Sequence, residues 1–142
     1  IIGLKNLNYW DRLKNLDLYS LQRRRERYMI ILVWKIYNNI LANDVNIVFK
    51  ESERRGVTCV RPLGSSKYSS INTMRFNSFS STASALYNVV PPNIKAISSL
   101  KLNKFKAELD SFLDTFPDTP PTPGYSGANK NSLLEWTGCR SQ

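Results

Sequence analysis

The chain has 142 residues, with 20 lysines and arginines against 11 aspartates and glutamates, a net charge of +9 at pH 7, and no histidine. This length suits one domain, and the hydrophobic fraction of 42% exceeds what disordered chains carry. Without histidine, imidazole zinc sites, Ser-His-Asp triads and Cys-His dyads are excluded, and the excess positive charge favours an anionic partner such as nucleic acid or an acidic membrane.

The cysteine content and the apolar runs bear on where the protein works. Two cysteines, Cys59 and Cys139, are too few for the disulfide framework of a small secreted domain. The longest apolar stretch, residues 28–34, is too short to span a bilayer, and no signal-like segment precedes it. We therefore expect an intracellular protein, cytoplasmic or nuclear. Binding to an acidic membrane through the basic segment 23–34 is not expected, because the apolar stripe of that segment resembles an ordinary core face. Because the chain begins with Ile1 rather than Met, we also expect it to be processed or part of a longer protein.

Apolar residues at helical spacing predict two helices in the N-terminal third, a short one over residues 9–16 and a longer one over residues 21–39 with Ser20 as its N-cap. The longer helix should bury one apolar stripe. That stripe comprises Leu21, Tyr28, Met29, Leu32, Val33, Ile36 and Ile40.

Four arginines lie in the first two turns of this longer helix. They are Arg23, Arg24, Arg25 and Arg27. Because the unpaired N–H groups of a helix N-terminus already carry partial positive charge, an anion should compensate the cluster. Either phosphate groups of a ligand or the chain's own Glu26 and Asp17 could supply the negative charge.

The middle of the chain, residues 42–79, is rich in Ser, Asn and Gly, and β-prone pieces at residues 45–49 and 57–60 predict a small hairpin or irregular loops. Three cations alternate with aromatic residues in its second half. The cations are Arg61, Lys67 and Arg75, and the aromatic residues are Tyr68, Phe76 and Phe79. This pattern suits a single nucleic-acid strand whose bases stack on the rings. The alternative is that Phe76 and Phe79 anchor the segment in the core while the charges face water.

Two further helices are predicted, over residues 82–88, ending before Pro91, and over residues 103–115, with Ser99 or Asn103 as the N-cap. Beyond residue 116 the composition becomes proline-rich, which is typical of a tail or linker. Within this tail a capping-box pattern, Ser132 with Glu135, predicts a short helical latch over residues 132–136 that docks on this chain's core or on a partner.

These elements predict a mostly α fold: a small basic helical domain over residues 1–116, with an irregular or hairpin middle segment, followed by a proline-rich tail over residues 117–142. The charge is polarised along the chain. Residues 1–78 hold 14 basic and 6 acidic side chains, a net charge of +8, whereas residues 79–142 hold 6 basic and 5 acidic ones.

The order of four motifs resembles the C-terminal region, downstream of the polymerase domain, of non-LTR retrotransposon reverse transcriptases. The motifs are LYSLQRRR (18–25), VWKIYN (33–38), LYNVVP (86–91) and LNKFKAELD (102–110). Tyr87 stands where that family has tryptophan, Val90 where it has leucine, and Thr82 where an arginine is common.

This resemblance implies an RNA-directed DNA polymerase of a transposable element whose chemistry lies outside the present chain. A polymerase needs clustered carboxylates to hold two metal ions, and no adjacent pair of aspartates occurs here. We therefore expect no catalytic residue, no metal site and no cofactor in this chain, and hence no enzymatic activity of its own.

The predicted function is sequence-nonspecific binding of RNA or DNA as a non-catalytic appendage of such a reverse transcriptase. The residues predicted to contact phosphates are Arg23, Arg24, Arg25, Arg27, Lys35, Arg61, Lys67 and Arg75. The alternative is a protein-protein interaction or scaffold module, which packs on a polymerase domain, associates with itself or acts as a stand-alone protein derived from such an element.

Overall fold

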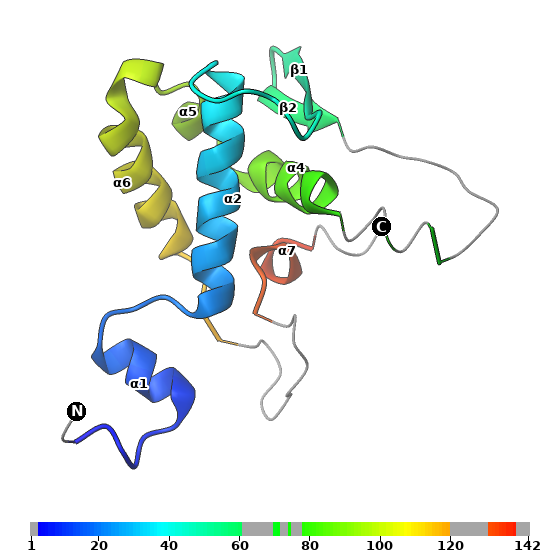
Figure 1. Ribbon diagram of the computed structural model, residues 1–142. Coiled ribbons are helices and arrows are strands. Elements are labelled where there is room, and N and C mark those ends of the chain that lie inside the picture. The colour runs from blue at the N-terminus through cyan, green and yellow to red at the C-terminus, as the bar shows by residue number, and fades with distance from the viewer. Residues whose placement is uncertain (1–2, 61–69, 72–73, 75–77, 120–130, 139–142) are drawn as a thin grey trace.

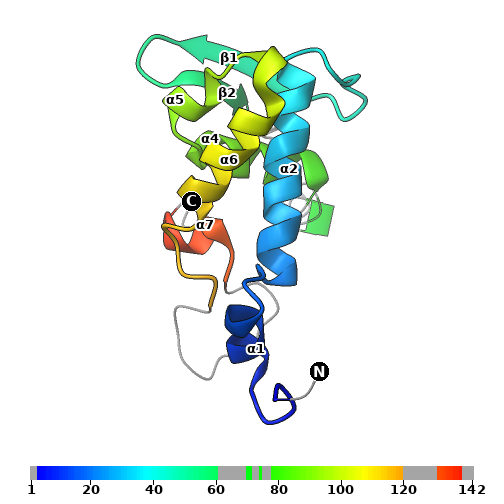
Figure 2. The ribbon, with the colours of Figure 1, turned by 90° about the vertical axis from the view of Figure 1, so that its left-hand side faces the viewer.

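The computed structural model describes residues 3–60, 70–71, 74, 78–119 and 131–138. One long helix, α2 (Leu21–Tyr37), is the central element. In Figures 1 and 2, α6 (Leu102–Leu113) lies alongside α2, and α4 (Phe79–Val89) packs across it. A single two-stranded sheet completes the described part of the chain, so the prediction of a mostly helical fold is confirmed.

The helix α2 begins where its cap predicts and ends two residues earlier than its pattern predicts. The Ser20 hydroxyl oxygen accepts the Arg23 N–H at 3.1 Å, which confirms Ser20 as the N-cap. At the other end, Asn39 adopts a left-handed backbone conformation with φ of 55°, which stops the helix. Trp34 of α2 is fully buried and stacks on Phe105 of α6 with ring centroids 4.3 Å apart.

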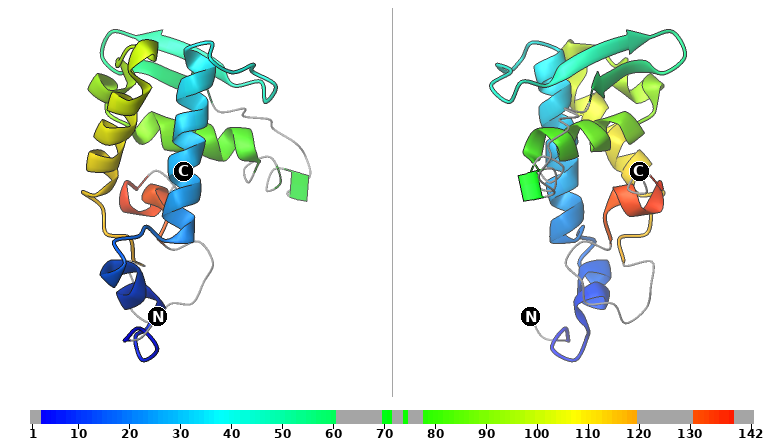
Figure 3. Two further views of the ribbon diagram at one scale, coloured as in Figure 1. Left: turned by 60° about the vertical axis from the view of Figure 1, so that its left-hand side comes forward. Right: turned by 90° about the vertical axis from the view of Figure 1, so that its right-hand side faces the viewer.

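The helix α1 (Tyr9–Asn15) lies at the opposite end of α2 from the hairpin (Figures 1 and 3). The Asn8 side chain caps it by accepting the Asp11 N–H at 3.0 Å. No residue of α1 is buried, and Tyr9 is half exposed. The apolar spacing that predicts this helix therefore does not mark a core face.

The hairpin consists of β1 (Val48–Ser52) and β2 (Gly56–Val60), which pair antiparallel with Phe49 opposite Cys59. The first strand begins three residues later than predicted because the preceding segment forms a loop. In that loop the Asn43 side chain accepts the Ile47 N–H at 2.9 Å and donates to the Ile47 carbonyl at 2.8 Å.

The hairpin is tied to α4 by one asparagine side chain. Asn88 accepts the Cys59 N–H at 2.7 Å and donates to the Cys59 carbonyl at 2.9 Å, so it satisfies both backbone groups of that residue as a neighbouring strand would. Gly56 has φ of 60° and lies against the short helix α5 (Pro92–Lys95), where a Cβ atom would come within 3.2 Å of the Pro92 Cβ.

The helix α4 begins three residues before its predicted start, with Ser78 as its N-cap, and ends ahead of Pro91 as predicted. Its inward face buries Ala83, Leu86 and Tyr87. This short helix of small residues fits closely against α2.

The predicted cap of α6 is wrong. Neither Ser99 nor Asn103 caps it, because a 3₁₀ turn, η1 (Ser99–Lys101), leads directly into the helix and Lys101 occupies the cap position without a side-chain hydrogen bond. Apolar residues at three and four residue intervals from Leu102 to Phe116 predict the buried stripe of this helix. Phe105, Leu109 and Leu113 are at most 1% exposed, whereas Leu102, Phe112 and Phe116 are only partly buried.

The latch helix α7 (Leu133–Trp136) docks on the chain's own core, which decides between the two docking sites that the sequence leaves open. Leu133 is fully buried, and its N–H donates to the Glu26 carboxylate at 3.0 Å. Ser132 caps α7 by accepting the Leu134 N–H at 3.3 Å. The end of the chain that the composition assigns to a tail thus contributes to the core beside α2 and α4.

Candidate nucleic-acid interface

Arg23, the first of the predicted phosphate-binding arginines, is buried in the protein core. Its exposed fraction is 0%, its Nε lies 3.7 Å from an Asp118 carboxylate oxygen, and its Nη2 donates to the Pro117 carbonyl at 3.1 Å. Among the described residues, its Nε and Nη1 have no hydrogen-bond partner. The prediction that Arg23 contacts phosphate is therefore wrong, because no ligand can reach it.

The carboxylate at the start of α2 is Asp118. Glu26 and Asp17, which the sequence offers as compensating charges, form no ion pair with the four arginines among the described residues. Asp118 accepts hydrogen bonds from the Ser20 N–H, from the Ser20 hydroxyl at 2.7 Å and from the Asn131 side chain at 3.0 Å. A carboxylate at a helix N-terminus is favourable both for the unpaired N–H groups and for the helix dipole.

Arg27 is also engaged within the protein. Its Nη2 donates to Asp110 of α6 at 2.8 Å, its Nε donates to the other oxygen of the same carboxylate, and this pairing raises the pKa of the guanidinium. The side chain is 19% exposed. Arg27 therefore joins α2 to α6, and a phosphate would have to displace Asp110 to bind it.

The remaining predicted cations of α2 lie on its outward face. Arg24 and Arg25 are exposed and Lys35 is half-buried, and none of the three forms an ion pair with any part of the chain that the structure describes. Arg24, Tyr28 and Lys35 are separated by four and seven positions, so they follow one side of the helix. We call the three cations Arg24, Arg25 and Lys35 the α2 basic face.

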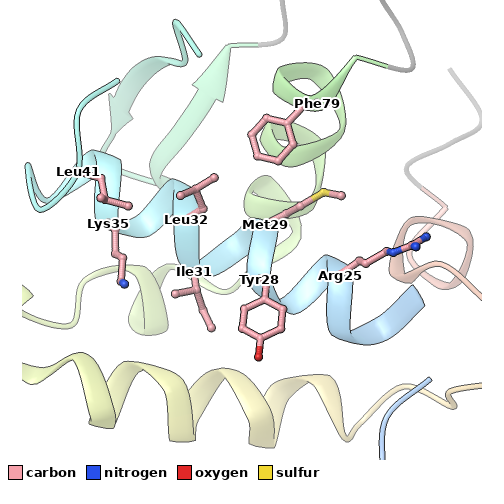
Figure 4. A pocket seen from close by; sticks show the side chains of 8 residues that line it. All are labelled: Arg25, Tyr28, Met29, Ile31, Leu32, Lys35, Leu41 and Phe79. Atoms are coloured by element: carbon pink, nitrogen blue, oxygen red, sulfur yellow. The ribbon is translucent and has the colours of Figure 1, made fainter. Parts of the chain in front are cut away.

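An apolar groove of about 390 Å³ adjoins the α2 basic face (Figure 4). It is lined by Arg25, Tyr28, Met29, Ile31, Leu32, Lys35, Leu41 and Phe79. Arg25 and Lys35 lie toward its two ends, with apolar and aromatic side chains between them. This volume lies in the range of small-molecule sites.

Sequence reasoning missed the aromatic part of this surface. Leu21 and Tyr28 are predicted to face the core, but they are 51% and 65% exposed. Val33 and Ile36 of the predicted stripe are buried, and Ile30 and Trp34, which the stripe does not include, complete the buried face. Leu21, Arg24, Tyr28 and Lys35 follow one another at intervals of three, four and seven residues, a helical spacing that could have revealed a second face combining cations with apolar groups.

The three predicted cations of the middle segment, Arg61, Lys67 and Arg75, lie outside the described residues, as do Tyr68 and Phe76. Phe79, the last aromatic residue of that pattern, is 38% exposed and reaches the apolar groove. It therefore neither fills the core nor lies free in solvent.

A second pocket, between α1 and α6, is acidic. Asp17, Asp110, Asp114 and Asp118 line it together with Tyr19, whose hydroxyl donates to Asp114. Burial, followed by this hydrogen bond, raises the pKa of Tyr19. Asp110 and Asp118 are paired with Arg27 and Arg23, and Lys14 also lines the pocket, so Asp17 and Asp114 are the carboxylates here without an arginine partner among the described residues.

The buried titratable groups near the hairpin have structural partners. Burial raises the pKa of the Cys59 thiol to about 11 and lowers the pKa of Lys95, whose ammonium group donates to the Asn88 carbonyl at 3.4 Å. Among the described residues, no group of three His, Cys, Asp or Glu side chains could hold a metal ion. None of the described helices has the length and apolar character needed to cross a membrane.

No family model, curated protein or solved structure matches this chain. The resemblance to the C-terminal region of retrotransposon reverse transcriptases therefore stays a prediction.

Proposed function

We propose that this chain is a non-catalytic nucleic-acid-binding module that contacts the phosphates of RNA or DNA through the α2 basic face. The observation that carries the proposal is that Arg24 and Arg25, which are exposed, and Lys35, which is half-buried, lie on the outward side of one helix and have no acidic partner among the described residues. The sequence motifs make the C-terminal region of a retroelement reverse transcriptase its expected setting.

Unpaired cations on one helix face lower the stability of the folded chain, but they favour the binding of a polyanion. Three like charges on one surface repel each other, and phosphate groups would relieve that repulsion while releasing counterions. The exposed cations of the hairpin, Lys50, Arg54 and Arg55, alternate with Glu51 and Glu53, so their local field is weaker. Phosphate contacts fix a protein on a strand without reading bases, so little sequence preference is expected.

The test compares two triple variants of equal charge by fluorescence anisotropy with labelled single strands and duplexes across a salt series. Arg24→Ala, Arg25→Ala and Lys35→Ala together remove the α2 basic face. Lys101→Ala, Lys104→Ala and Lys106→Ala together remove three charges at the start of α6. Because both variants lose the same net charge, a difference in affinity between them shows that the position of the removed charges matters.

We expect the first variant to lose most of its affinity, and its slope of log affinity against log salt on duplex to fall by as much as about 2.7, at roughly 0.9 per phosphate contact. The α6 variant should stay close to the parent chain. Equal losses of affinity in the two variants would show that binding depends on net charge and not on the α2 basic face, which would contradict the proposal. Binding by the parent chain that does not depend on salt would also refute it.

A protein interaction module is the second candidate function, and exposed apolar side chains near α1 favour it. Tyr9, Leu16 and Leu18 are between 42% and 50% exposed. If they form an interface between copies, the chain should self-associate in sedimentation velocity, and Leu16→Ser with Leu18→Ser should yield a monomer. A parent chain that is monomeric at all concentrations would rule out self-association.

A further inference from the structure

The apolar groove beside the α2 basic face is not explained by phosphate binding. Phosphate contacts require only the cations, yet between Arg25 and Lys35 lie the exposed ring of Tyr28, the partly buried Met29 and Leu32, and the ring of Phe79 from α4. Hydrocarbon and aromatic surface left open to water in this way favours a ligand that also carries apolar groups.

The charges at its two ends limit the chemistry of that ligand. Arg25 and Lys35 are ten positions apart on one helix, which places their Cα atoms roughly 15 Å apart along the axis. An occupant that satisfies both cations must therefore carry negative charges at intervals, and it must place flat apolar groups between them. An unpaired nucleic-acid strand has this composition, since its phosphates alternate with bases whose faces are apolar.

We propose that this groove binds unpaired bases of a single-stranded RNA or DNA, with Tyr28 and Phe79 as stacking surfaces and with Arg25 and Lys35 on the flanking phosphates. The inference rests on the proposed function, because the same basic face must first attract the strand. It adds a preference for single strands over duplex.

The groove is expected to distinguish single strands from duplex, because only a single strand can place an unpaired base inside it. In a duplex the bases are paired and stacked on one another, so only the phosphates can reach this surface. In a single strand a base can leave its neighbours and stack on an exposed ring, as it does in known single-strand binders. Tyr28 is 65% exposed, so its ring needs no rearrangement of the core to accept a base.

The experiment measures affinity for three labelled probes of equal length by fluorescence anisotropy: a mixed-sequence single strand, an abasic single strand and a duplex. The abasic strand keeps the phosphates and lacks the bases. The variants are Tyr28→Ala, Phe79→Ala and Tyr28→Phe, which retains the ring, with Tyr9→Ala as the control for an exposed tyrosine elsewhere. Thermal melting checks that each variant is folded.

We expect Tyr28→Ala to weaken binding of the mixed-sequence strand by about 5-fold to 150-fold, the range that corresponds to the loss of one stacked base. Phe79→Ala should act in the same direction, whereas Tyr28→Phe and Tyr9→Ala should stay near the parent chain. Binding of the abasic strand and of the duplex should not change in any of the four variants.

Equal affinity of the parent chain for mixed-sequence and abasic strands would overturn the inference, and so would a folded Tyr28→Ala variant with unchanged affinity. In either case, loss of binding on removal of the α2 basic face would leave the proposed function standing. If no probe binds the parent chain, the proposed function fails as well. A Tyr28→Ala variant that changes only sedimentation would assign the groove to a protein partner, which also overturns the inference.

Discussion

Replacing Asp118 by alanine should destabilise the protein strongly, because it leaves the buried Arg23 guanidinium without its counter-charge. Arg23 is 0% exposed and keeps only the Pro117 carbonyl as a partner among the described residues once Asp118 is gone. Breaking a buried ion pair from one side costs about 3–5 kcal/mol. The substitution also removes the acceptor of the Ser20 N–H at the start of α2.

This cost should lower the melting temperature by about 6–20 °C, at roughly 2–4 °C per kcal/mol for a chain of this size. Urea denaturation followed by circular dichroism gives the free energy of unfolding directly. Asp44→Ala is the control, since Asp44 is exposed and forms no hydrogen bond or ion pair with the described residues. A double variant, Arg23→Met with Asp118→Ala, should recover part of the loss because it removes both charges. An Asp118→Ala variant within about 0.5 kcal/mol of the parent would refute the reasoning.

Three other substitutions probe the packing and the buried thiol. Phe105→Ala should cost about 3–5 kcal/mol of unfolding free energy, since it opens a cavity against the Trp34 ring, and a loss below about 1 kcal/mol would contradict the stacked core. Leu133→Ala should cost about 2–5 kcal/mol if α7 is docked as described, whereas an undocked latch would give no change in melting temperature. Because burial raises the pKa of the Cys59 thiol from 9.0 to about 11, its contribution to stability is present below pH 9 and is lost as the pH rises toward 11. Comparing Cys59→Ala with the parent across this range should therefore show a smaller alkaline loss in the variant, by on the order of 2 kcal/mol, and parallel profiles would contradict the shift.

Local signals in the sequence predict the helices well and the faces that they bury less well. Ser20 is recognisable as a cap because its hydroxyl acts within one turn, and the stripe from Phe105 to Leu113 is recognisable because it repeats within one helix. The start of α6 lies within one residue of its prediction, but its cap does not follow from local sequence, since a 3₁₀ turn over Ser99–Lys101 leads into the helix instead of a serine or asparagine cap.

Whether each arginine of α2 is buried or exposed cannot be predicted from sequence spacing. Arg23 and Arg24 are neighbours in sequence, yet one is buried against Asp118, 95 positions further along the chain, and the other is exposed. Burial of an arginine depends on a carboxylate that only the tertiary fold brings near. Tyr28 also depends on the tertiary fold. Its side chain is apolar enough for a core position, but it lies outside because Trp34 and its neighbours occupy the core side of α2.

Contact between the α2 basic face and nucleic acid can be mapped by titrating an isotope-labelled chain with an unlabelled single strand and following its backbone amide resonances by NMR. We expect the largest shifts on the outward side of α2 around Arg24, Arg25 and Lys35, while α6 residues around Lys104 stay nearly unchanged. Shifts concentrated on α6, or no shifts at any strand concentration, would contradict this contact.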